Sequence, residues 1–303
     1  MVNAAQSAYV AKPSLVSRVL KSRKSPIASL EGKKTLITGA GSGIGRATAL
    51  AAAREGADLF LTDINAQGLA DTARDAEKLG AVVSFSQALD ISDYDVVTAF
   101  ADAIFDEFGS MDIVMNVAGI SAWGTVENLE HRHWKSMVDV NLMGPIHIIE
   151  NFVPPMVRAG RGGHLVNVSS AAGLLALPWH AAYSASKFGL RGVSEVLRFD
   201  LKRHRIGVSL VVPGAVKTPL VGTVEIAGVD REDPRIQKAV GLFERRAVSP
   251  EKVASCILQG IEKNRYMVYS SPDIRFGYWW ARKFAPPYEF VMQKANDQFS
   301  KFL

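Results

Sequence analysis

Short apolar runs alternate along the chain with longer stretches in which apolar residues recur at helical spacing. The short runs predict strands at 35–38, 58–62, 82–86, 113–116, 164–168, 207–212 and 266–269. The stretches between them predict helices at 47–55, 66–79, 94–108, 131–152, 181–204 and 250–262. Near-continuously apolar strands separated by helices are typical of a parallel sheet covered on both faces. The pattern therefore predicts an α/β fold with a single doubly wound parallel sheet.

Two segments lie outside this alternation. Residues 1–30 form a basic arm with apolar residues at helical spacing, and residues 271–303 form an aromatic-rich C-terminal extension. From Tyr266 onward the chain holds 11 of its 26 aromatic residues. We therefore predict one domain at 31–270 with an extension at each end. The extension at 271–303 suits a membrane interface, a lid over a pocket or a clasp between subunits equally well.

The net charge of +5 is concentrated in the arm. Residues 1–34 contain seven Lys or Arg against one acid, which leaves 28 basic and 29 acidic side chains in residues 35–303. A nearly neutral body argues against nucleic acid as a partner, since a nucleic-acid-binding domain presents a distributed basic face. The basic arm is expected to be disordered or to bind a surface.

The single cysteine, Cys256, excludes an internal disulfide framework and a cysteine-rich zinc site. No apolar run approaches the roughly 18 residues that a membrane span needs, and the N-terminus lacks the apolar stretch of a secretory signal. We expect a cytoplasmic protein, and weak membrane-surface association through the arm or the C-terminal extension stays open.

A glycine-rich segment, residues 38–45, lies between the first predicted strand and the first helix. Glycines there permit a tight turn and let backbone N–H groups approach a pyrophosphate at the helix N-terminus. Asp63 ends the second strand, where an acid hydrogen-bonds ribose hydroxyls and repels a 2′-phosphate. Neither Ser42 nor the residue after Asp63 is a cation, so the sequence favours NAD(H) over NADP(H).

Tyr183 and Lys187 are four residues apart on a predicted helix, so their side chains lie on the same face. A neighbouring cation favours the phenolate and is expected to lower the tyrosine pKa from about 10. Such a phenol can exchange a proton with a substrate oxygen near neutral pH.

The motifs resemble, in order and across about residues 31–270, those of the short-chain dehydrogenase/reductase family. Residues 38–45 are similar to its TGxxxGxG motif, and residues 116–119 to its NNAG motif with Val117 in place of the second asparagine. The resemblance implies a Rossmann-like fold and an oxidoreductase that uses a nicotinamide cofactor. The implied catalytic residues are Asn141, Ser170, Tyr183 and Lys187. The implied cofactor contacts are Gly39, Ser42, Gly43, Ile44, Gly45, Asp63, Asp90, Ile91, Asn116, Ala118, Gly119, Tyr183, Lys187, Pro213, Gly214, Val216 and Thr218.

By the same resemblance, Tyr183 is the general acid or base, and Lys187 lowers its pKa and holds the ribose. Ser170, rather than the adjacent Ser169, hydrogen-bonds the reacting oxygen, because it stands 13 residues before Tyr183. Asn141 holds a water that links the lysine to solvent, or fills an irregularity of the helix. A homodimer or homotetramer is expected.

Residues 220–247 fall where this family places a lid over the substrate. The lid and the segment before Tyr183 are expected to form an apolar wall, made of Val221, Val224, Ile226, Val229, Val240, Leu242, Phe243, Leu174, Leu175, Leu177 and Trp179. Such a pocket favours a bulky hydrophobic alcohol or ketone of lipid, steroid, retinoid or terpenoid type. The same side chains could instead form core or subunit contacts.

Three smaller features complete the predictions. His131 and His133 are expected at the surface and, two residues apart on a helix, make a poor metal pair; no metal is expected. His180 is expected near the substrate or in a packing role. Pro154 and Pro155 are expected to end the helix before them.

Two alternatives to an alcohol dehydrogenase stay open. A 3-oxoacyl-thioester reductase could use the basic arm to attract an acidic carrier protein, although Asp63 disfavours the NADPH that such enzymes usually take. A non-catalytic NAD(H)-sensing scaffold is the other, although this chain keeps all four catalytic positions.

Overall fold

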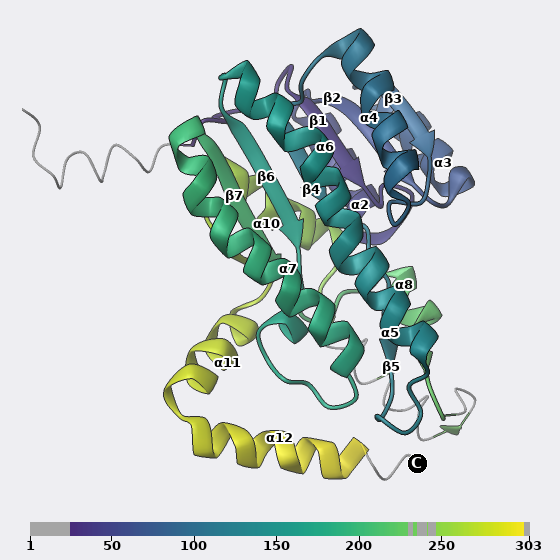
Figure 1. Ribbon diagram of the computed structural model, residues 1–303, viewed down its shortest axis with the longest axis vertical. Helices are drawn as coiled ribbons and strands as arrows, with labels where there is room; N and C mark the ends of the chain where they lie inside the picture. The colour runs from purple at the N-terminus through teal and green to yellow at the C-terminus, as the bar shows by residue number, and fades with distance from the viewer. Residues whose placement is uncertain (1–24, 230–232, 235–240, 242–246, 300–303) are drawn as a thin grey trace, which may run out of the picture.

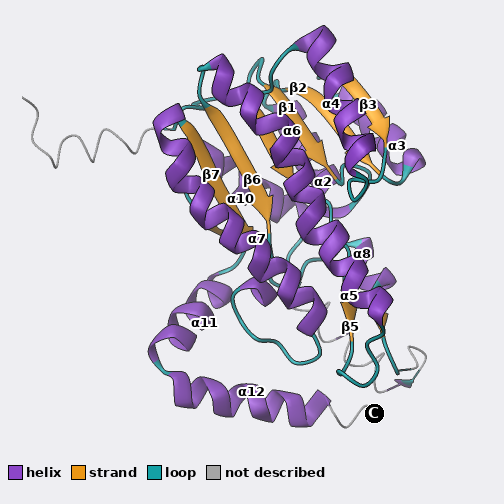
Figure 2. Cartoon of the chain, in the orientation of Figure 1, coloured by secondary structure: helices purple, strands orange, loops and turns teal. Residues whose placement is uncertain are grey.

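The computed structural model describes residues 25–229, 233–234, 241 and 247–299. Seven strands form one parallel sheet in the order β3-β2-β1-β4-β6-β7-β9, with helices on both faces (Figures 1 and 2), which confirms the predicted fold class. The strands are β1 Lys34–Thr38, β2 Asp58–Asp63, β3 Val82–Ala88, β4 Ile113–Asn116, β6 Gly163–Val168, β7 Ile206–Val212 and β9 Met267–Tyr269. Each lies within one residue of its prediction, except at the end of β3.

Neighbouring residues of each central strand enter different cores, because side chains alternate between the faces of a sheet. Ile37 packs into a core with α2 (Gly43–Arg54), α3 (Ala66–Lys78) and α10 (Pro250–Glu262). Leu36 packs into the opposite core with α4 (Tyr94–Phe108), α6 (Gly144–Ala159) and α7 (Ala181–Asp200). Both residues are fully buried, so the sheet is covered on both sides as the apolar strands predict.

The helix predicted at 131–152 is three segments: α5 (His131–Val138), the π-helical η1 (Asp139–Met143) and α6. The expectation that Pro154 and Pro155 end this helix is wrong, since α6 continues through both to Ala159. Because proline has no N–H, Pro154 cannot bond the carbonyl four residues earlier, that of Glu150. Glu150 is exposed, so water can reach this part of the helix. Burial of Phe152 and Met156 against the sheet holds the helix on both sides of the prolines. The helix stops instead at Gly160, in the left-handed region with φ 64°.

Several elements have no counterpart in the sequence prediction. β5 (Ala122–Trp123) and β8 (Glu225–Ile226) form a small second sheet, and α8 (Pro219–Thr223) begins the predicted lid. The 3-10 turns are η2 (Ala171–Gly173) and η3 (Leu201–His204). In the C-terminal extension, α11 (Pro272–Lys283) and α12 (Ala285–Phe299) extend beyond the carboxyl ends of the strands (Figure 1). No helix among the described residues is long and apolar enough to cross a membrane.

The sheet order changes direction between β1 and β4, because β2 and β3 lie on one side of β1 and the later strands on the other. In open α/β sheets, ligands bind outside the carboxyl ends of the strands at such a switch point. The glycine-rich segment and the loops after β4, β6 and β7 all lie at this edge.

Candidate active site

The glycine-rich turn fits closely against the loop after β4. At Gly39, with φ 69°, an added Cβ would lie 2.7 Å from Ala118 Cα, and at Gly45 it would lie 1.9 Å from the Gly39 carbonyl oxygen. Both positions therefore require glycine. A Cβ at Gly43 would lie 3.1 Å from Thr218 Cγ2, so the turn also meets the segment after β7. The close approach of bare backbone at the N-terminus of α2 is the geometry that accommodates a pyrophosphate.

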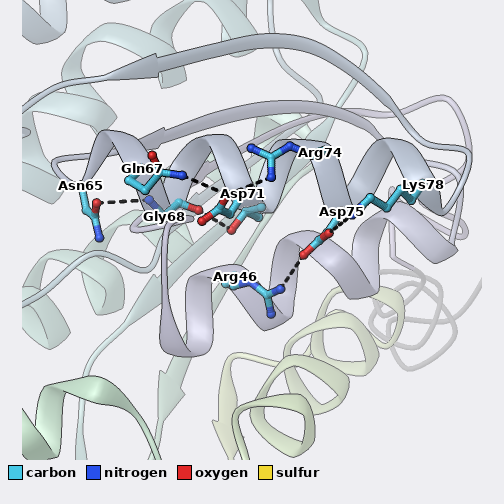
Figure 3. Close-up of polar contacts among 9 residues, drawn as sticks. Arg46, Asn65, Gln67, Gly68, Asp71, Arg74, Asp75 and Lys78 are labelled. Carbon is cyan, nitrogen blue, oxygen red and sulfur yellow. Dashed lines mark hydrogen bonds and ion pairs between the residues drawn. The ribbon is translucent and has the colours of Figure 1, made fainter.

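Asp63 lies at the end of β2 beside this turn. Its carboxylate accepts hydrogen bonds from the backbone N–H groups of Gly41 and Asn65, each at 2.8 Å. The next residue, Ile64, is 72% exposed and carries no charge. Arg46, the first cation of α2, forms an ion pair with Asp75 of α3 at 2.7 Å (Figure 3). The acid is therefore held in place, and the nearest cation on α2 is neutralised by α3.

Three further predicted cofactor contacts, Asp90, Ile91 and Asn116, differ in how far they are exposed. Asp90 is exposed, and its carboxylate accepts two bonds from Ser92. Ile91 is buried. Asn116 is 1% exposed, and its side-chain amide donates to Asn167 Oδ1 at 2.9 Å. The Asn116 side chain thus ties β4 to β6, and its role toward a cofactor stays a prediction.

A cavity of about 550 Å³ opens at the carboxyl ends of β4, β6 and β7. It brings together residues from segments that are far apart in the sequence. The predicted site residues that line it are Ile44, Gly119, Ser170, Tyr183, Lys187, Pro213, Gly214, Val216 and Thr218. One concave site therefore contains the glycine-rich turn together with Ser170, Tyr183 and Lys187.

Lys187 lies one helical turn after Tyr183 in α7, as the spacing predicts. The lysine is 4% exposed, its Nζ donates to the Val168 carbonyl oxygen at 3.1 Å, and it lies 5.8 Å from the centre of the Tyr183 ring. Burial lowers the pKa of Lys187 to about 8. Removal from water disfavours the charged ammonium, so this lysine is protonated at neutral pH only at a cost.

The pKa of Tyr183 differs from the expectation. Burial raises the pKa of its phenol above the ordinary value, and a hydrogen bond from the Ser170 hydroxyl opposes this rise. The expected lowering of the Tyr183 pKa is wrong, because loss of solvation disfavours the phenolate more strongly than the Ser170 hydrogen bond favours it. Ser169 is turned away and donates to the Lys187 carbonyl oxygen at 3.0 Å, so only Ser170 bonds the phenol.

Asn141 is fully buried within the π-helical segment η1. Its side chain accepts from the Ile120 N–H and donates to the Ile120 carbonyl, both at 2.9 Å. A Cβ at Gly119 would lie 2.9 Å from Asn141 Oδ1 and 3.3 Å from Lys187 Nζ, so the two side chains flank the same glycine. The amide thus fixes the loop after β4 at the irregularity of the helix, close to the lysine.

The apolar wall is partly as predicted. Leu175, Leu177 and Val224 line the cavity. Leu174 and Trp179 instead pack into core clusters, the tryptophan with a left-handed backbone at φ 65°. Val240, Leu242 and Phe243, and the side chain of Val221, lie outside the described residues.

Further lining residues were missed by the sequence reading. Ser121 and Trp123 line the cavity, and the serine accepts from the indole N–H at 2.8 Å. The Trp123 ring lies 4.6 Å from His180, which also lines the cavity and whose pKa burial lowers, so this histidine is neutral at pH 7. Asp273 and Ile274 reach the cavity from α11. Only tertiary contact connects Trp123, Asp273 and Ile274 to the site, whereas Ser121 follows the NVAG motif closely. His180 was expected near the substrate or in a packing role, and it lines the cavity.

The expectation for His133 was wrong. It is 2% exposed, accepts from the Glu130 N–H through Nδ1, and places Nε2 2.9 Å from Glu225. It joins α5 to β8 and is no surface residue, whereas His131 is exposed. Among the described residues, no three His, Cys, Asp or Glu side chains are grouped so that they could hold a metal ion.

The fold and this site define the class of protein: a Rossmann-type, nucleotide-dependent enzyme. Residues 33–227 match the family model for short chain dehydrogenases, and the chain therefore belongs to the short-chain dehydrogenase/reductase family of oxidoreductases, which act on alcohols and ketones.

Named relatives cover most of the chain. The putative oxidoreductase SadH of Mycobacterium tuberculosis is 40% identical over 80% of this chain and 87% of its own. The 3-oxoacyl-acyl-carrier-protein reductase FabG of Thermotoga maritima is 34% identical over 76% and 90%, respectively. The (-)-trans-carveol dehydrogenase of Rhodococcus erythropolis is 37% identical over 69% and 80%.

Solved structures show the same fold with either cofactor. A short-chain dehydrogenase from Burkholderia phymatum in complex with NAD has a TM-score of 0.77 at 29% identity, covering 85% of this chain and 95% of its own. An alcohol dehydrogenase from Thermococcus sibiricus complexed with 5-hydroxy-NADP has a TM-score of 0.66 at 25% identity, covering 79% and 95%. Similarity alone therefore leaves the choice between NAD and NADP to the residues at the end of β2.

Proposed function

We propose that this enzyme transfers a hydride between NAD(H) and a bulky hydrophobic secondary alcohol or ketone. The observation that carries the proposal is the meeting of Ser170, Tyr183 and Lys187 with apolar side chains in one cavity beside the glycine-rich turn. When bound, a nicotinamide supplies the hydride chemistry, and the protein supplies orientation and a proton.

The side chains divide the remaining work. The Tyr183 hydroxyl donates its proton to the carbonyl oxygen during reduction, and the Tyr183 phenolate accepts the proton of the alcohol during oxidation. The Ser170 hydroxyl has one hydrogen, which it donates to the phenol; with substrate bound it turns to donate that hydrogen to the developing alkoxide instead. Lys187 keeps a positive charge beside the phenol, which favours the phenolate when the proton leaves.

The choice of NAD(H) rests on Asp63. Two backbone N–H groups hold its carboxylate in place. There the carboxylate would accept hydrogen bonds from the ribose hydroxyls. A 2′-phosphate there would meet a fixed negative charge, with the uncharged Ile64 next to it and Arg46 already paired with Asp75. The geometry supports NAD(H) by repulsion of the phosphorylated form.

The hydrophobic substrate follows from the cavity wall. Leucines from the loop before α7, Trp123 and Val224 surround the space beside Tyr183, and the cavity of about 550 Å³ has to hold the nicotinamide end of the cofactor together with the substrate. His180 is neutral and Asp273 is the only acid among the lining residues of the described chain. The similarity to a carveol dehydrogenase supports a cyclic, apolar alcohol.

Substitution of Tyr183 by Phe tests the proposal. The variant keeps the ring and loses the proton donor, so turnover of a responsive ketone is expected to fall by a factor of about 10³ or more, while NADH binding stays within about threefold. Stopped-flow absorbance of NADH measures the first quantity, and calorimetric titration with NADH measures the second. Activity within tenfold of wild type would refute the role of Tyr183.

A second candidate is a 3-oxoacyl-thioester reductase, which the similarity to FabG favours. A panel that pairs lipophilic cyclic ketones with acetoacetyl-thioesters, each with NADH and with NADPH, separates the two. A higher kcat/KM for thioesters with NADPH would replace the leading proposal. Tight NADH binding with no turnover of either class would indicate a non-catalytic sensor.

A further inference from the structure

The outer side of α11 and the residue that follows it, Phe284, carry a cluster of aromatic rings that face solvent. Phe276 is 64% exposed, Trp279 is 50% exposed and Phe284 is 46% exposed. Their rings are in contact as a row, with centroids 5.8 Å apart for the first pair and 5.9 Å for the second. Single exposed apolar residues are ordinary on a protein surface, whereas contiguous ones mark a site of interaction. We call these three side chains the aromatic row.

The opposite side of α11 packs against the domain. The rings of the aromatic row are therefore exposed on a helix that is held in place. The Tyr278 hydroxyl accepts a hydrogen bond from Arg191 of α7 at 2.8 Å, and the arginine lies 5.3 Å from the tyrosine ring. Ile274, one turn earlier on the same face, lines the substrate cavity. The domain therefore fixes the helix and leaves the aromatic row facing outward.

Like α11, α12 has one side toward the domain and the other toward solvent. The Tyr288 hydroxyl accepts from the Ala176 N–H at 2.8 Å, in the loop that carries two leucines of the cavity wall. The half-buried residues of α12, Tyr288, Met292 and Ala295, recur at helical spacing on the side toward the domain. Phe290, which is 61% exposed, lies on the other side. In Figure 1 both helices lie along the end of the molecule at which the carboxyl ends of the strands point.

Cations border the aromatic row. Arg275 and Lys283 are exposed and lie one turn before and one turn after Trp279, so their side chains flank its ring. Arg282 instead lies on the side of Tyr278, whose hydroxyl accepts from it at 3.5 Å. The cores of protein–protein interfaces are depleted in lysine, whereas aromatic rings beside Lys and Arg suit the headgroup region of a bilayer with anionic lipids. Charge and ring composition together favour a lipid surface over a second copy of this chain.

From these contacts we propose that the aromatic row docks the enzyme on the surface of an anionic lipid bilayer. The rings enter the headgroup region and the flanking cations contact lipid phosphates, without any helix crossing the membrane. Because α11 and the Ala176 loop both border the substrate cavity, docking places the cavity beside the lipid. The consequence, that an apolar alcohol can be taken from the bilayer, rests on the proposed function; the docking itself does not.

Vesicle flotation of the full chain tests the proposal, with vesicles of phosphatidylcholine alone or mixed with phosphatidylglycerol. The wild type is expected to float with the anionic vesicles, and the variant Phe276→Ser/Trp279→Ser/Phe284→Ser is expected to lose at least about fivefold in bound fraction. A matched control, Tyr94→Ser/Val196→Ser/Phe199→Ser, removes side chains that are 47%, 59% and 62% exposed elsewhere, and is expected to float like the wild type. The variant Arg275→Glu/Lys283→Glu keeps the rings. It is expected to bind less to the vesicles that contain phosphatidylglycerol, with no change for vesicles of phosphatidylcholine alone.

Flotation of the serine variant at the wild-type level would overturn the proposal, as would failure of the wild type to float. If light scattering shows that the serine variant changes the number of subunits while the wild type ignores vesicles, the row is a subunit contact, and docking is overturned. Reduction of a water-soluble ketone is measured on the same samples. For the wild type, intact turnover without flotation refutes docking only, and flotation without turnover refutes the proposed function only.

Discussion

Replacement of Lys187 by Met should stabilise the nucleotide-free protein while removing its activity. The lysine is 4% exposed, and burial lowers its pKa from 10.5 to about 8. At 1.36 kcal/mol for each pKa unit, this difference corresponds to a penalty of about 3 kcal/mol for keeping the ammonium charged in the folded protein. Methionine has a similar length and no charge.

The expected gain is smaller than this penalty. The variant loses the hydrogen bond from Nζ to the Val168 carbonyl oxygen, which costs about 1 kcal/mol. The net stabilisation at neutral pH is therefore about 2 kcal/mol, or a rise in Tm of about 5 °C for a domain of this size. Turnover should fall by a factor of about 10² or more, since the charge beside Tyr183 is lost.

The pH dependence identifies the cause. A lysine whose folded pKa lies below its unfolded pKa makes the folded state more stable as pH rises between the two values. The penalty is fully present below about 8 and relieved by 10.5, so the advantage of the variant should shrink across this window. Urea unfolding at about pH 7 and about pH 10 measures it, with the exposed Lys202→Met as control, which should change stability by less than about 0.5 kcal/mol. A variant no more stable than wild type at neutral pH, or an advantage independent of pH, would refute the reasoning.

Three further predictions follow from the contacts. Asp63→Ser with Ile64→Arg should raise the NADPH-to-NADH ratio of kcat/KM by on the order of 100-fold, measured by initial rates; an unchanged ratio would remove Asp63 from the cofactor argument. Gly45→Ala should destabilise the protein by about 2 kcal/mol and abolish NADH binding in titration calorimetry, because its Cβ would lie 1.9 Å from the Gly39 carbonyl oxygen. Tyr288→Phe leaves the Ala176 N–H without its acceptor and should speed proteolytic cleavage at α12; an unchanged rate would show that the bond does not hold the helix.

The sequence by itself determined the sheet and the position of the cofactor turn. Strands buried on both faces are largely apolar, so the central strands of the large sheet could be recognised locally, whereas the end of the exposed edge strand β3 could not. Glycines at positions 39 and 45, between a strand and a helix, likewise indicate a close approach of the backbone. The pairing of Tyr183 with Lys187 is also local, because helical spacing alone puts them on one face.

Only the tertiary structure decided how these groups are solvated and what surrounds them. The direction of the Tyr183 pKa depends on burial by residues distant in sequence, which outweighs the opposing hydrogen bond from Ser170. His133 is buried where its Nε2 pairs with the carboxylate of Glu225 on β8. Helix α6 continues past Pro154 because Phe152 and Met156 pack against the sheet. Local periodicity carries no information about which distant segment covers a residue. That coverage decides the pKa of each ionisable group and which side chains line the cavity. For the same reason, only the structure shows that α11 reaches the cavity with one face and presents aromatic rings to solvent with the other.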